Sequence, residues 1–151
     1  MKARNFVTMS NAALASMLIL TGVACTLHIA PDYSPETATS IVDTEKAVDR
    51  FYAALEAVPQ DKRSFEQFSP AYQNVEVEIR SLILRSKIQP MNEKTTDMAN
   101  TLLDLWQKKE GRHKESNTYS DALADADQKM LDGLLTSMAL VQQSLKDSGT
   151  K

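Results

Sequence analysis

The sequence predicts an all-α protein whose folded part is an antiparallel up-down four-helix bundle. Glycine and proline are scarce, at 4 and 5 of 151 residues, and the stretches between them are rich in the helix formers Ala, Leu, Glu, Lys and Gln. Valine and isoleucine never form a long alternating run, so a sheet has little to be built from. With 42% hydrophobic and 25% charged residues, the composition is that of one globular domain.

The first predicted helix spans about residues 36–58 and ends at Pro59. Its apolar residues recur at steps of three, four or seven, with Thr44 filling the gap, and form one narrow stripe. The stripe consists of Ile41, Val48, Phe51, Leu55 and Val58.

The second predicted helix begins at Ser69–Pro70 and ends at Gln89–Pro90, because serine caps free amides and proline suits the first helical position. Phe65 and Phe68 precede it and are expected in a short turn over the end of the core. One face carries Tyr72, Val75, Ile79, Leu82 and Ile83, and the far side carries Val77, Leu84 and Ile88. Two apolar sides indicate a central helix, or a helix that also meets a partner.

The third predicted helix is capped by Asn92 and closed by Gly111. Its expected buried residues are Met98, Leu102 and Leu105, flanked by Leu103 and Trp106. The following segment "RHKESNT", residues 112–118, is expected to be a loop.

The fourth predicted helix spans about residues 119–146, and Gly133 within it is expected where a neighbour approaches closely. Its stripe consists of Tyr119, Leu123, Ala126, Met130, Leu134, Met138, Val141 and Leu145. Four helices with short connections pack as antiparallel neighbours. A three-helix bundle with a separate helix on the anchor side is the alternative.

The N-terminal region has the features of a cleavable export signal. Lys2 and Arg4 precede a stretch, residues 5–30, without a charged residue, and its most apolar part is residues 12–24. Thirteen helical residues span only about 20 Å, which is short of a hydrocarbon core of about 30 Å. A signal peptide is therefore favoured over a permanent membrane span.

The segment "LTGVAC", ending at the single cysteine Cys25, resembles the lipobox of bacterial lipoprotein precursors. The family usually has leucine three places before the cysteine, where this chain has Gly22, with Leu20 two residues earlier. The resemblance implies cleavage between Ala24 and Cys25, acylation of Cys25, and anchoring in membrane lipid at the cell envelope. Thr26, rather than aspartate, then indicates the outer membrane facing the periplasm, if the cell is Gram-negative.

The resulting organisation is a signal peptide at residues 1–24, a lipidated cysteine and tether at 25–35, a helical bundle at 36–147 and a C-terminal tail at 148–151. A lone cysteine cannot form an internal disulfide, and acylation accounts for both its solitude and its position. Two alternatives stay open, which are secretion with a free Cys25 and an uncleaved membrane helix through Ala30.

The charge pattern argues against nucleic-acid binding. Without residues 1–24, 15 basic and 20 acidic residues leave a net charge of −5. A local basic cluster contains Lys108, Lys109, Arg112 and Lys114, but Glu110 and Glu115 interrupt it. We therefore expect a solvated helix end there.

The sequence offers few groups for catalysis, so we expect no enzyme activity, cofactor or metal site. His28 lies in the tether, and His113 is expected in an exposed loop. Glu110 and His113 form a single Glu-x-x-His pair, whereas di-iron bundles need two such pairs and two further glutamates. Met98, Met130 and Met138 lie on helical stripes and are expected to pack in the core rather than bind copper.

The predicted function is a lipid-anchored envelope protein whose bundle is a non-catalytic interaction or structural module for an unidentified envelope protein. Candidate interface residues are Tyr72, Trp106, Arg80 and Arg85, although Trp106 fits the bundle core equally well, and the arginines fit ion pairs with a neighbouring helix. The oligomeric state stays open. The alternatives are a small periplasmic chaperone or stress protein, for which repeated LTxxQ-like signatures are missing, and a metal-binding bundle.

Overall fold

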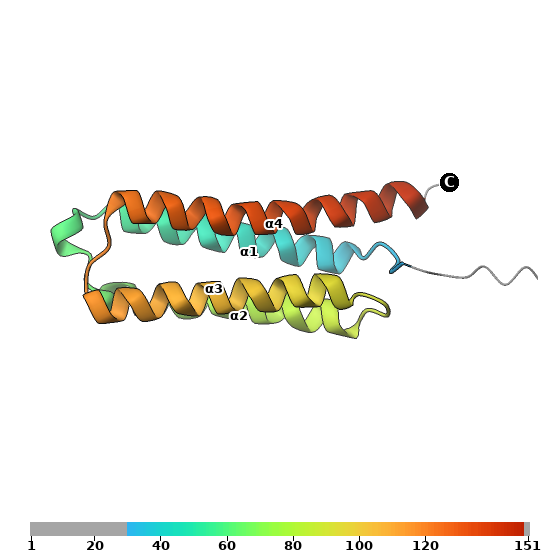
Figure 1. The fold of residues 1–151 in the computed structure, drawn as a ribbon, viewed down its shortest axis with the longest axis horizontal. Helices are drawn as coiled ribbons and strands as arrows, with labels where there is room; N and C mark the ends of the chain where they lie inside the picture. Colours follow the sequence, from blue (N-terminus) through green and yellow to red (C-terminus); the bar gives the residue numbers. More distant parts are fainter. Residues whose placement is uncertain (1–29, 150–151) are drawn as a thin grey trace, which may run out of the picture.

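The computed structural model describes residues 30–149, which form an antiparallel four-helix bundle (Figure 1). The helices are α1 (Pro35–Glu56), α2 (Phe65–Ile88), α3 (Glu93–Ser116) and α4 (Asp121–Gly149), with a short turn, η1 (Gln60–Lys62), after α1. α1 packs against α2 and α4, and α3 packs against the same two helices. All four share one core, so the predicted fold class is confirmed and the three-helix alternative is wrong.

α1 begins within one residue of the predicted start and buries the predicted stripe except for Val58, which is half-buried and lies beyond the end of the helix at Glu56. The Ser34 hydroxyl accepts a hydrogen bond from the Thr37 amide at 3.1 Å, and Pro35 occupies the first helical position. Thr44 is buried within the stripe and donates to the Ser40 carbonyl oxygen at 2.8 Å, so the expected gap-filling position needs no outside partner.

α2 begins at Phe65, four residues before the predicted start at Ser69. The side chain of Asn117, from the loop after α3, accepts a hydrogen bond from the Phe65 amide at 2.9 Å, and Phe68 is buried in the first turn. Pro70 therefore lies inside the helix. The predicted core face is buried except for the half-buried Ile83, whereas the second stripe is exposed, so α2 is not a central helix.

α3 passes through Gly111 and continues to Ser116, so the predicted end at Gly111 is wrong, and the predicted loop at residues 112–118 is correct only for residues 117–118. Asn117, with φ 50°, is the left-handed residue that ends the helix. The extra turn is stabilised by His113, which is buried with two hydrogen-bond partners. Asn92 stands at the N-cap, but its side chain bonds the Ser86 carbonyl oxygen instead of capping.

α4 is rotated about its axis relative to the predicted stripe. Its buried line consists of Ala124, Asp127, Leu131, Leu135, Met138 and Gln142. Ala126, Met130 and Val141, predicted to be in the core, are exposed. Tyr119 is buried but precedes the helix, which begins at Asp121 and runs to Gly149. No atom lies within 4 Å of a Cβ built on Gly133, so the predicted close approach there is wrong.

The core contains a cluster of aromatic side chains from α1, α2 and α3. Trp106 is fully buried, and its indole N–H donates to the Tyr72 carbonyl oxygen at 3.0 Å. The Phe51 ring lies 4.4 Å from the Tyr72 ring and 4.9 Å from the Trp106 ring between centroids. Such tilted and edge-to-face pairs stabilise the core beyond the burial of their area.

The predicted cleavage and lipidation site, Ala24 and Cys25, lies outside the described residues, as does His28. Among the helices of residues 30–149, none combines the length and apolar character needed to cross a membrane.

Candidate functional site

A buried ion-pair cluster joins α3 to α4 near the end of the bundle that carries η1. Asp127 is central: Lys109 donates to its Oδ1 at 2.7 Å, and Tyr119 donates to its Oδ2 at 2.5 Å. Arg112 also pairs with Oδ2. The side chains of Lys109 and Asp127 are each only 5% exposed. The expectation of a solvated basic cluster is therefore wrong for Lys109, which is buried with its counter-ion.

His113 belongs to the same end of the bundle and is neutral there. Its Nε2 lies 3.0 Å from the Arg63 carbonyl oxygen, which can only accept, so Nε2 carries the hydrogen. Nδ1 then accepts from the Tyr72 hydroxyl at 3.2 Å. Burial lowers the pKa of His113, and the bond to the Arg63 carbonyl offsets this only in part. The predicted exposed loop histidine is thus a buried structural residue.

Arg63, which follows η1, ties the connecting segments together. Its side chain is 3% exposed and donates to the carbonyl oxygens of Val58 at 2.7 Å and Tyr119 at 3.0 Å. It also forms an ion pair with the exposed Asp121 at 2.7 Å. This pair, together with a hydrogen bond from Gln60, lowers the pKa of Asp121. One guanidinium therefore links the α1–α2 connection to the start of α4.

Tyr119 and Tyr72 act as hydrogen-bond donors at neutral pH. Burial, with the hydrogen bond to Asp127 adding to it, raises the pKa of Tyr119 to about 12. Burial likewise raises the pKa values of Tyr52 and Tyr72. With Asp127 bonded to three donors and His113 to two groups, the arrangement holds the bundle end together rather than leaving a base free for a substrate.

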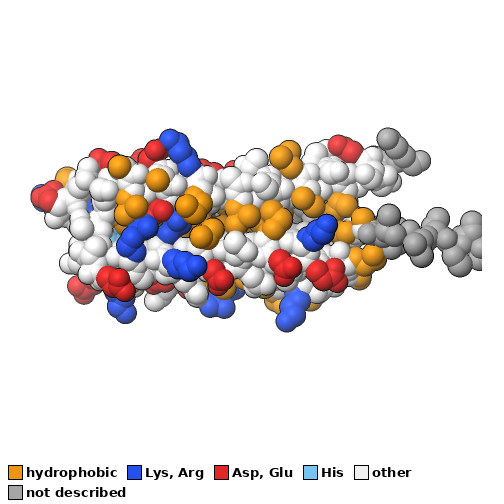
Figure 2. All heavy atoms as spheres, in the orientation of Figure 1, with side chains coloured by type: hydrophobic (Ala, Val, Ile, Leu, Met, Phe, Trp, Pro, Cys, Tyr) orange, Lys and Arg blue, Asp and Glu red, His pale blue; other side chains and the backbone are white. Residues whose placement is uncertain are grey.

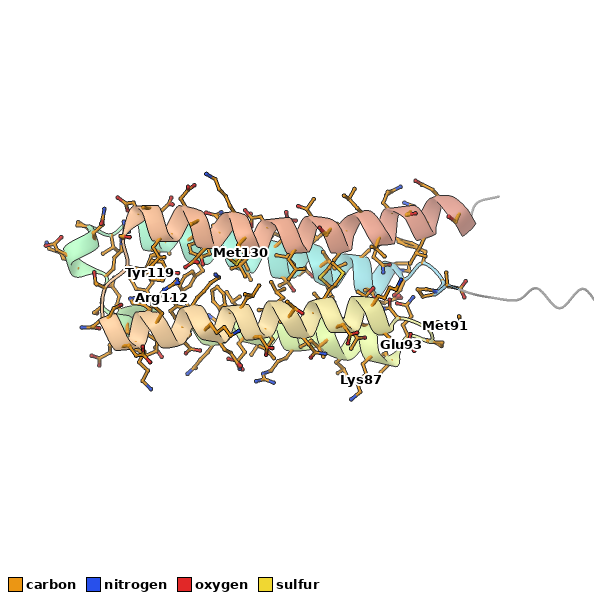
Figure 3. All side chains as sticks on the ribbon, in the orientation of Figure 1. Lys87, Met91, Glu93, Arg112, Tyr119 and Met130 are labelled. Atoms are coloured by element: carbon orange, nitrogen blue, oxygen red, sulfur yellow. The ribbon has the colours of Figure 1, made fainter. Side chains whose placement is uncertain are left out.

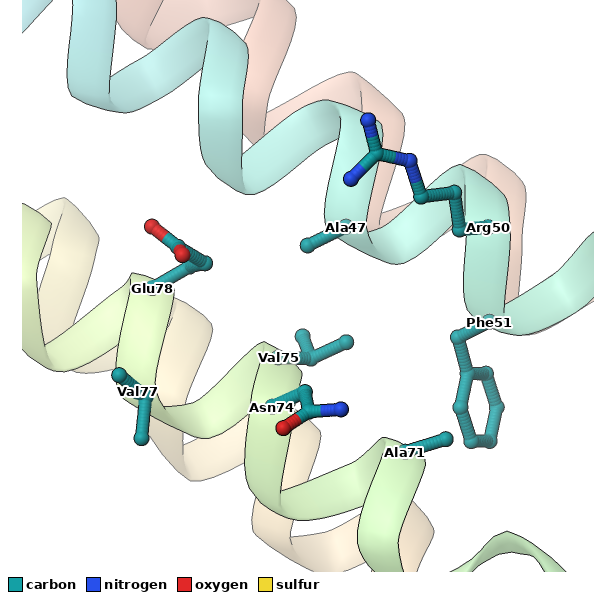
Figure 4. A pocket seen from close by; sticks show the side chains of 8 residues that line it. All are labelled: Ala47, Arg50, Phe51, Ala71, Asn74, Val75, Val77 and Glu78. Carbon is teal, nitrogen blue, oxygen red and sulfur yellow. The ribbon is translucent and has the colours of Figure 1, made fainter.

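A groove between α1 and α2 has a volume of about 380 Å³ (Figure 4). Arg50 stands on the α1 wall and Glu78 on the α2 wall, above apolar side chains. The lining residues are Ala47, Arg50, Phe51, Ala71, Asn74, Val75, Val77 and Glu78. The groove is open on one side and combines one cation and one anion, so it offers shallow contacts without a preference for either charge.

The largest continuous apolar surface in Figure 2 is a band along the line where α3 and α4 meet. α3 and α4 pack against each other far less extensively than the other neighbouring helices do. The band, here called the α3–α4 face, consists of exposed or half-buried residues: Met98, Thr101 and Leu105 of α3, and Leu123, Ala126, Met130, Leu134, Ser137 and Val141 of α4. Met130 is 51% exposed and projects from α4 toward α3 (Figure 3).

The charges nearest the α3–α4 face are basic. On α4 the positions that line it, from residue 123 to residue 141, carry no charge. On α3 its rim consists of Lys94 and Arg112, which adjoin the face, and of Lys108, which lies further round the helix. Asp97 and Asp104 follow directly beyond Lys108, and both acidic and basic side chains lie below the band in Figure 2. The charges that directly adjoin the face are therefore basic, and the acidic ones lie outside them.

A second exposed apolar stripe runs along the outside of α2. Val77, Leu84 and Ile88 are 60%, 61% and 74% exposed. This stripe was visible in the sequence as the second apolar side of the helix. It is narrower than the α3–α4 face, because α2 alone supplies it and Ser81 interrupts it.

The predicted interface residues fall into two groups. Tyr72 and Trp106 are fully buried in the core, so neither is exposed for a partner to contact. Arg80 and Arg85 are exposed on α2, and Arg80 pairs with Glu76 of the same helix at 2.5 Å rather than with a neighbouring helix. Met130 and Val141, which were predicted to be in the core, lie on the exposed α3–α4 face, so that prediction is wrong for both residues.

Comparison of the chain with models of protein families, with curated proteins and with solved structures finds no match. Within residues 30–149, no group of three or more His, Cys, Asp or Glu side chains is placed to hold a metal ion. The interpretation of the site therefore rests on its own geometry.

Proposed function

We propose that this bundle is a non-catalytic protein-interaction module, that it binds through the α3–α4 face, and that an acylated Cys25 holds it at the cell-envelope membrane. The single observation that carries the binding role is the open apolar face of the least tightly packed helix pair. Water-exposed apolar area of this kind is stabilised when another protein covers it, by about 25 cal/mol for each Å² removed from water.

The polar cluster supports the module by fixing the orientation of the two helices that form the face. Lys109 and Asp127 join α3 to α4 directly beneath it, and the Lys109 ammonium also contacts the Met130 sulfur at 3.8 Å. Because α3 and α4 pack sparsely, this ion pair fixes their position relative to each other. The apolar side chains of the face can therefore stay exposed while the two helices remain together.

The binding role is tested by site-specific photo-crosslinking in cells that express the full chain. A crosslinking residue replaces Met130 or Val141 on the α3–α4 face, and a matched variant carries it at Leu84 on α2. A discrete crosslinked protein obtained from both α4 positions, and not from Leu84, is the expected result. Equal crosslinking from all three positions, or from none, contradicts the proposal.

The anchoring role is tested by the intact mass of the chain extracted from membranes. The expected mass corresponds to a chain that begins at Cys25 and carries diacylglyceryl and further acyl groups. A Cys25→Ser variant should then leave the membrane fraction. A mass that retains Met1, or a cleaved chain with a free thiol, contradicts the anchor and leaves the binding face to be judged by crosslinking.

A further inference from the structure

We propose that the segment bound on the α3–α4 face is an amphipathic α-helix of another protein whose apolar stripe is flanked by Asp and Glu. This inference rests on the proposed interaction function and specifies its partner. The shape of the face is the first argument. Two antiparallel helices with apolar side chains along their junction present one continuous apolar strip, and a helix packs apolar residues at spacings of three, four and seven against such a strip.

The length of the face suits one helix. Leu123, Met130 and Val141 mark its α4 wall over about 27 Å, at 1.5 Å per residue, and Met98 and Leu105 stand on the α3 wall. Small residues, Ala126, Gly133 and Ser137, alternate with the large ones on α4, so a third helix can approach closely. No atom lies within 4 Å of a Cβ on Gly133, which leaves that space for a partner.

The charge of the rim specifies the flanks of the partner helix. Lys94 and Lys108 form no ion pair with any residue between 30 and 149, and Arg112 is 43% exposed although it also bonds Asp127. The α4 rim has no charge of its own. Carboxylates on the bound helix would therefore gain attraction from the α3 rim and meet no acidic side chain of the face.

The same charges argue against a second copy of this chain as the occupant. If two α3–α4 faces pack with their α3 helices antiparallel, Lys94 of one copy approaches Arg112 of the other. The face supplies no acid to balance these cations. Like charges brought together across an interface cost affinity, so the face selects a partner of different sequence.

A lipid surface is the less suitable occupant, although it too offers negative charge. Exposed tryptophan and phenylalanine, which insert into the headgroup region, are not among the residues of this face. Most of its apolar side chains are half-buried between α3 and α4. A helix that packs along this junction can contact them, whereas the flat surface of a bilayer cannot.

The experiment uses two designed helical peptides of about 21 residues that share one Leu stripe at heptad positions a and d. One carries Glu at the flanking e and g positions and the other carries Lys, and in both the like charges oppose self-association. Each fluorescent peptide is titrated against the full chain in phosphatidylcholine nanodiscs. If the chain does not enter nanodiscs, that result contradicts the Cys25 anchor but not the binding face. The titration is then done in detergent-free buffer.

We expect the Glu-flanked peptide to bind at least about tenfold more tightly than the Lys-flanked peptide at about 50 mM salt, with the difference shrinking as salt rises. Met130→Glu should abolish binding, and Lys108→Glu should reduce the preference for Glu flanks. Leu84→Glu on α2 is the matched control and should leave both affinities unchanged.

The inference is overturned by equal affinity for the two peptides, by no binding of either, or by an effect of Leu84→Glu that equals that of Met130→Glu. A dimer in sedimentation velocity that Met130→Glu disrupts would instead assign the face to a second copy. Met130-dependent binding to phosphatidylserine vesicles, without peptide binding, would assign it to lipid. Crosslinking from Met130 in cells combined with equal peptide affinities would retain the interaction function and remove only the acidic helix.

Discussion

Lys109 of α3 and Asp127 of α4 form an ion pair inside the bundle, with 2.7 Å between Nζ and Oδ1. The pair bridges the two helices that otherwise pack least against each other. Two further donors, Arg112 and Tyr119, bond the same carboxylate. Asp127 is therefore the shared acceptor of the cluster, and its loss affects more groups than the loss of any one donor.

We predict that Asp127→Asn destabilises the fold more than Lys109→Met. Without the carboxylate, Lys109 is left buried without a counter-ion, which costs about 3–5 kcal/mol of unfolding free energy. Lys109→Met keeps Asp127 bonded to Arg112 and Tyr119 and should cost clearly less. Urea unfolding followed by circular dichroism gives both values. Equal losses would show that the Lys109–Asp127 pair alone carries the stability and that the bonds of Asp127 to Arg112 and Tyr119 add little.

His113 should make the fold sensitive to acid. Burial lowers the pKa of His113 in the folded chain below its unfolded value of about 6.5. Above that pH, His113 is neutral in both the folded and the unfolded chain, so its titration does not reduce the free energy of unfolding. Below it the unfolded chain takes up a proton that the folded chain refuses, so stability falls by up to about 1.4 kcal/mol per pH unit until the folded pKa is reached.

The matched variant for this pH dependence is His113→Gln, whose amide can donate to the Arg63 carbonyl oxygen and accept from Tyr72 without titrating. Urea midpoints are measured for both proteins between about pH 8 and pH 5. The difference between the two curves isolates His113, since His28 and the carboxyl groups are common to both. Parallel curves would show that His113 does not carry the acid sensitivity.

Gly133→Ala should stabilise the protein by about 0.5–1 kcal/mol, because glycine inside a helix loses more backbone entropy on folding than alanine. Nothing lies within 4 Å of the new methyl group. Gly111→Ala in α3 meets the same open space and should give a gain of similar size. A higher midpoint of thermal unfolding measures each gain, and a loss in either would reveal a steric neighbour.

Arg63→Lys should destabilise the bundle by about 2–4 kcal/mol, although it keeps the positive charge. A lysine ammonium cannot reproduce the guanidinium fork that reaches the carbonyl oxygens of Val58 and Tyr119 together. Asp121→Asn, which alters only the exposed partner, should change stability little. If the two variants were equally harmful in urea unfolding, the exposed ion pair would be the dominant interaction.

The existence and order of the helices could be predicted from the sequence, because their apolar residues recur at helical spacing and short connections force antiparallel neighbours. Their ends were harder to predict. Ser69–Pro70 has the local features of a helix start, yet a hydrogen bond from the Phe65 amide to the distant Asn117 side chain sets the true start. Gly111 likewise has the features of a helix end. α3 continues past it because His113 bonds Tyr72 and the Arg63 carbonyl oxygen, which both lie outside α3.

The core register of α3 and α4 could not be predicted from single positions. A lysine or an aspartate is disfavoured in a core when it is considered alone, so Lys109 was expected in a solvated helix end, Asp127 was not part of the predicted core stripe, and Met130 was. Only their mutual ion pair makes both positions buried. The same pairing rotates α4 and exposes the stripe to which Met130 and Val141 belong, which is why the candidate face followed from the structure.

Because residues 30–149 form an even number of long helices, α4 ends at the end of the bundle where α1 begins. The Tyr33 ring, ahead of α1, receives the Lys146 ammonium at 5.7 Å, and the Gln142 side chain accepts from the Ser34 amide (Figure 1). A fluorescent reporter fused after α4 would therefore sit beside the start of α1. The opposite end of the bundle, where Arg63 and His113 lie, would stay unobstructed.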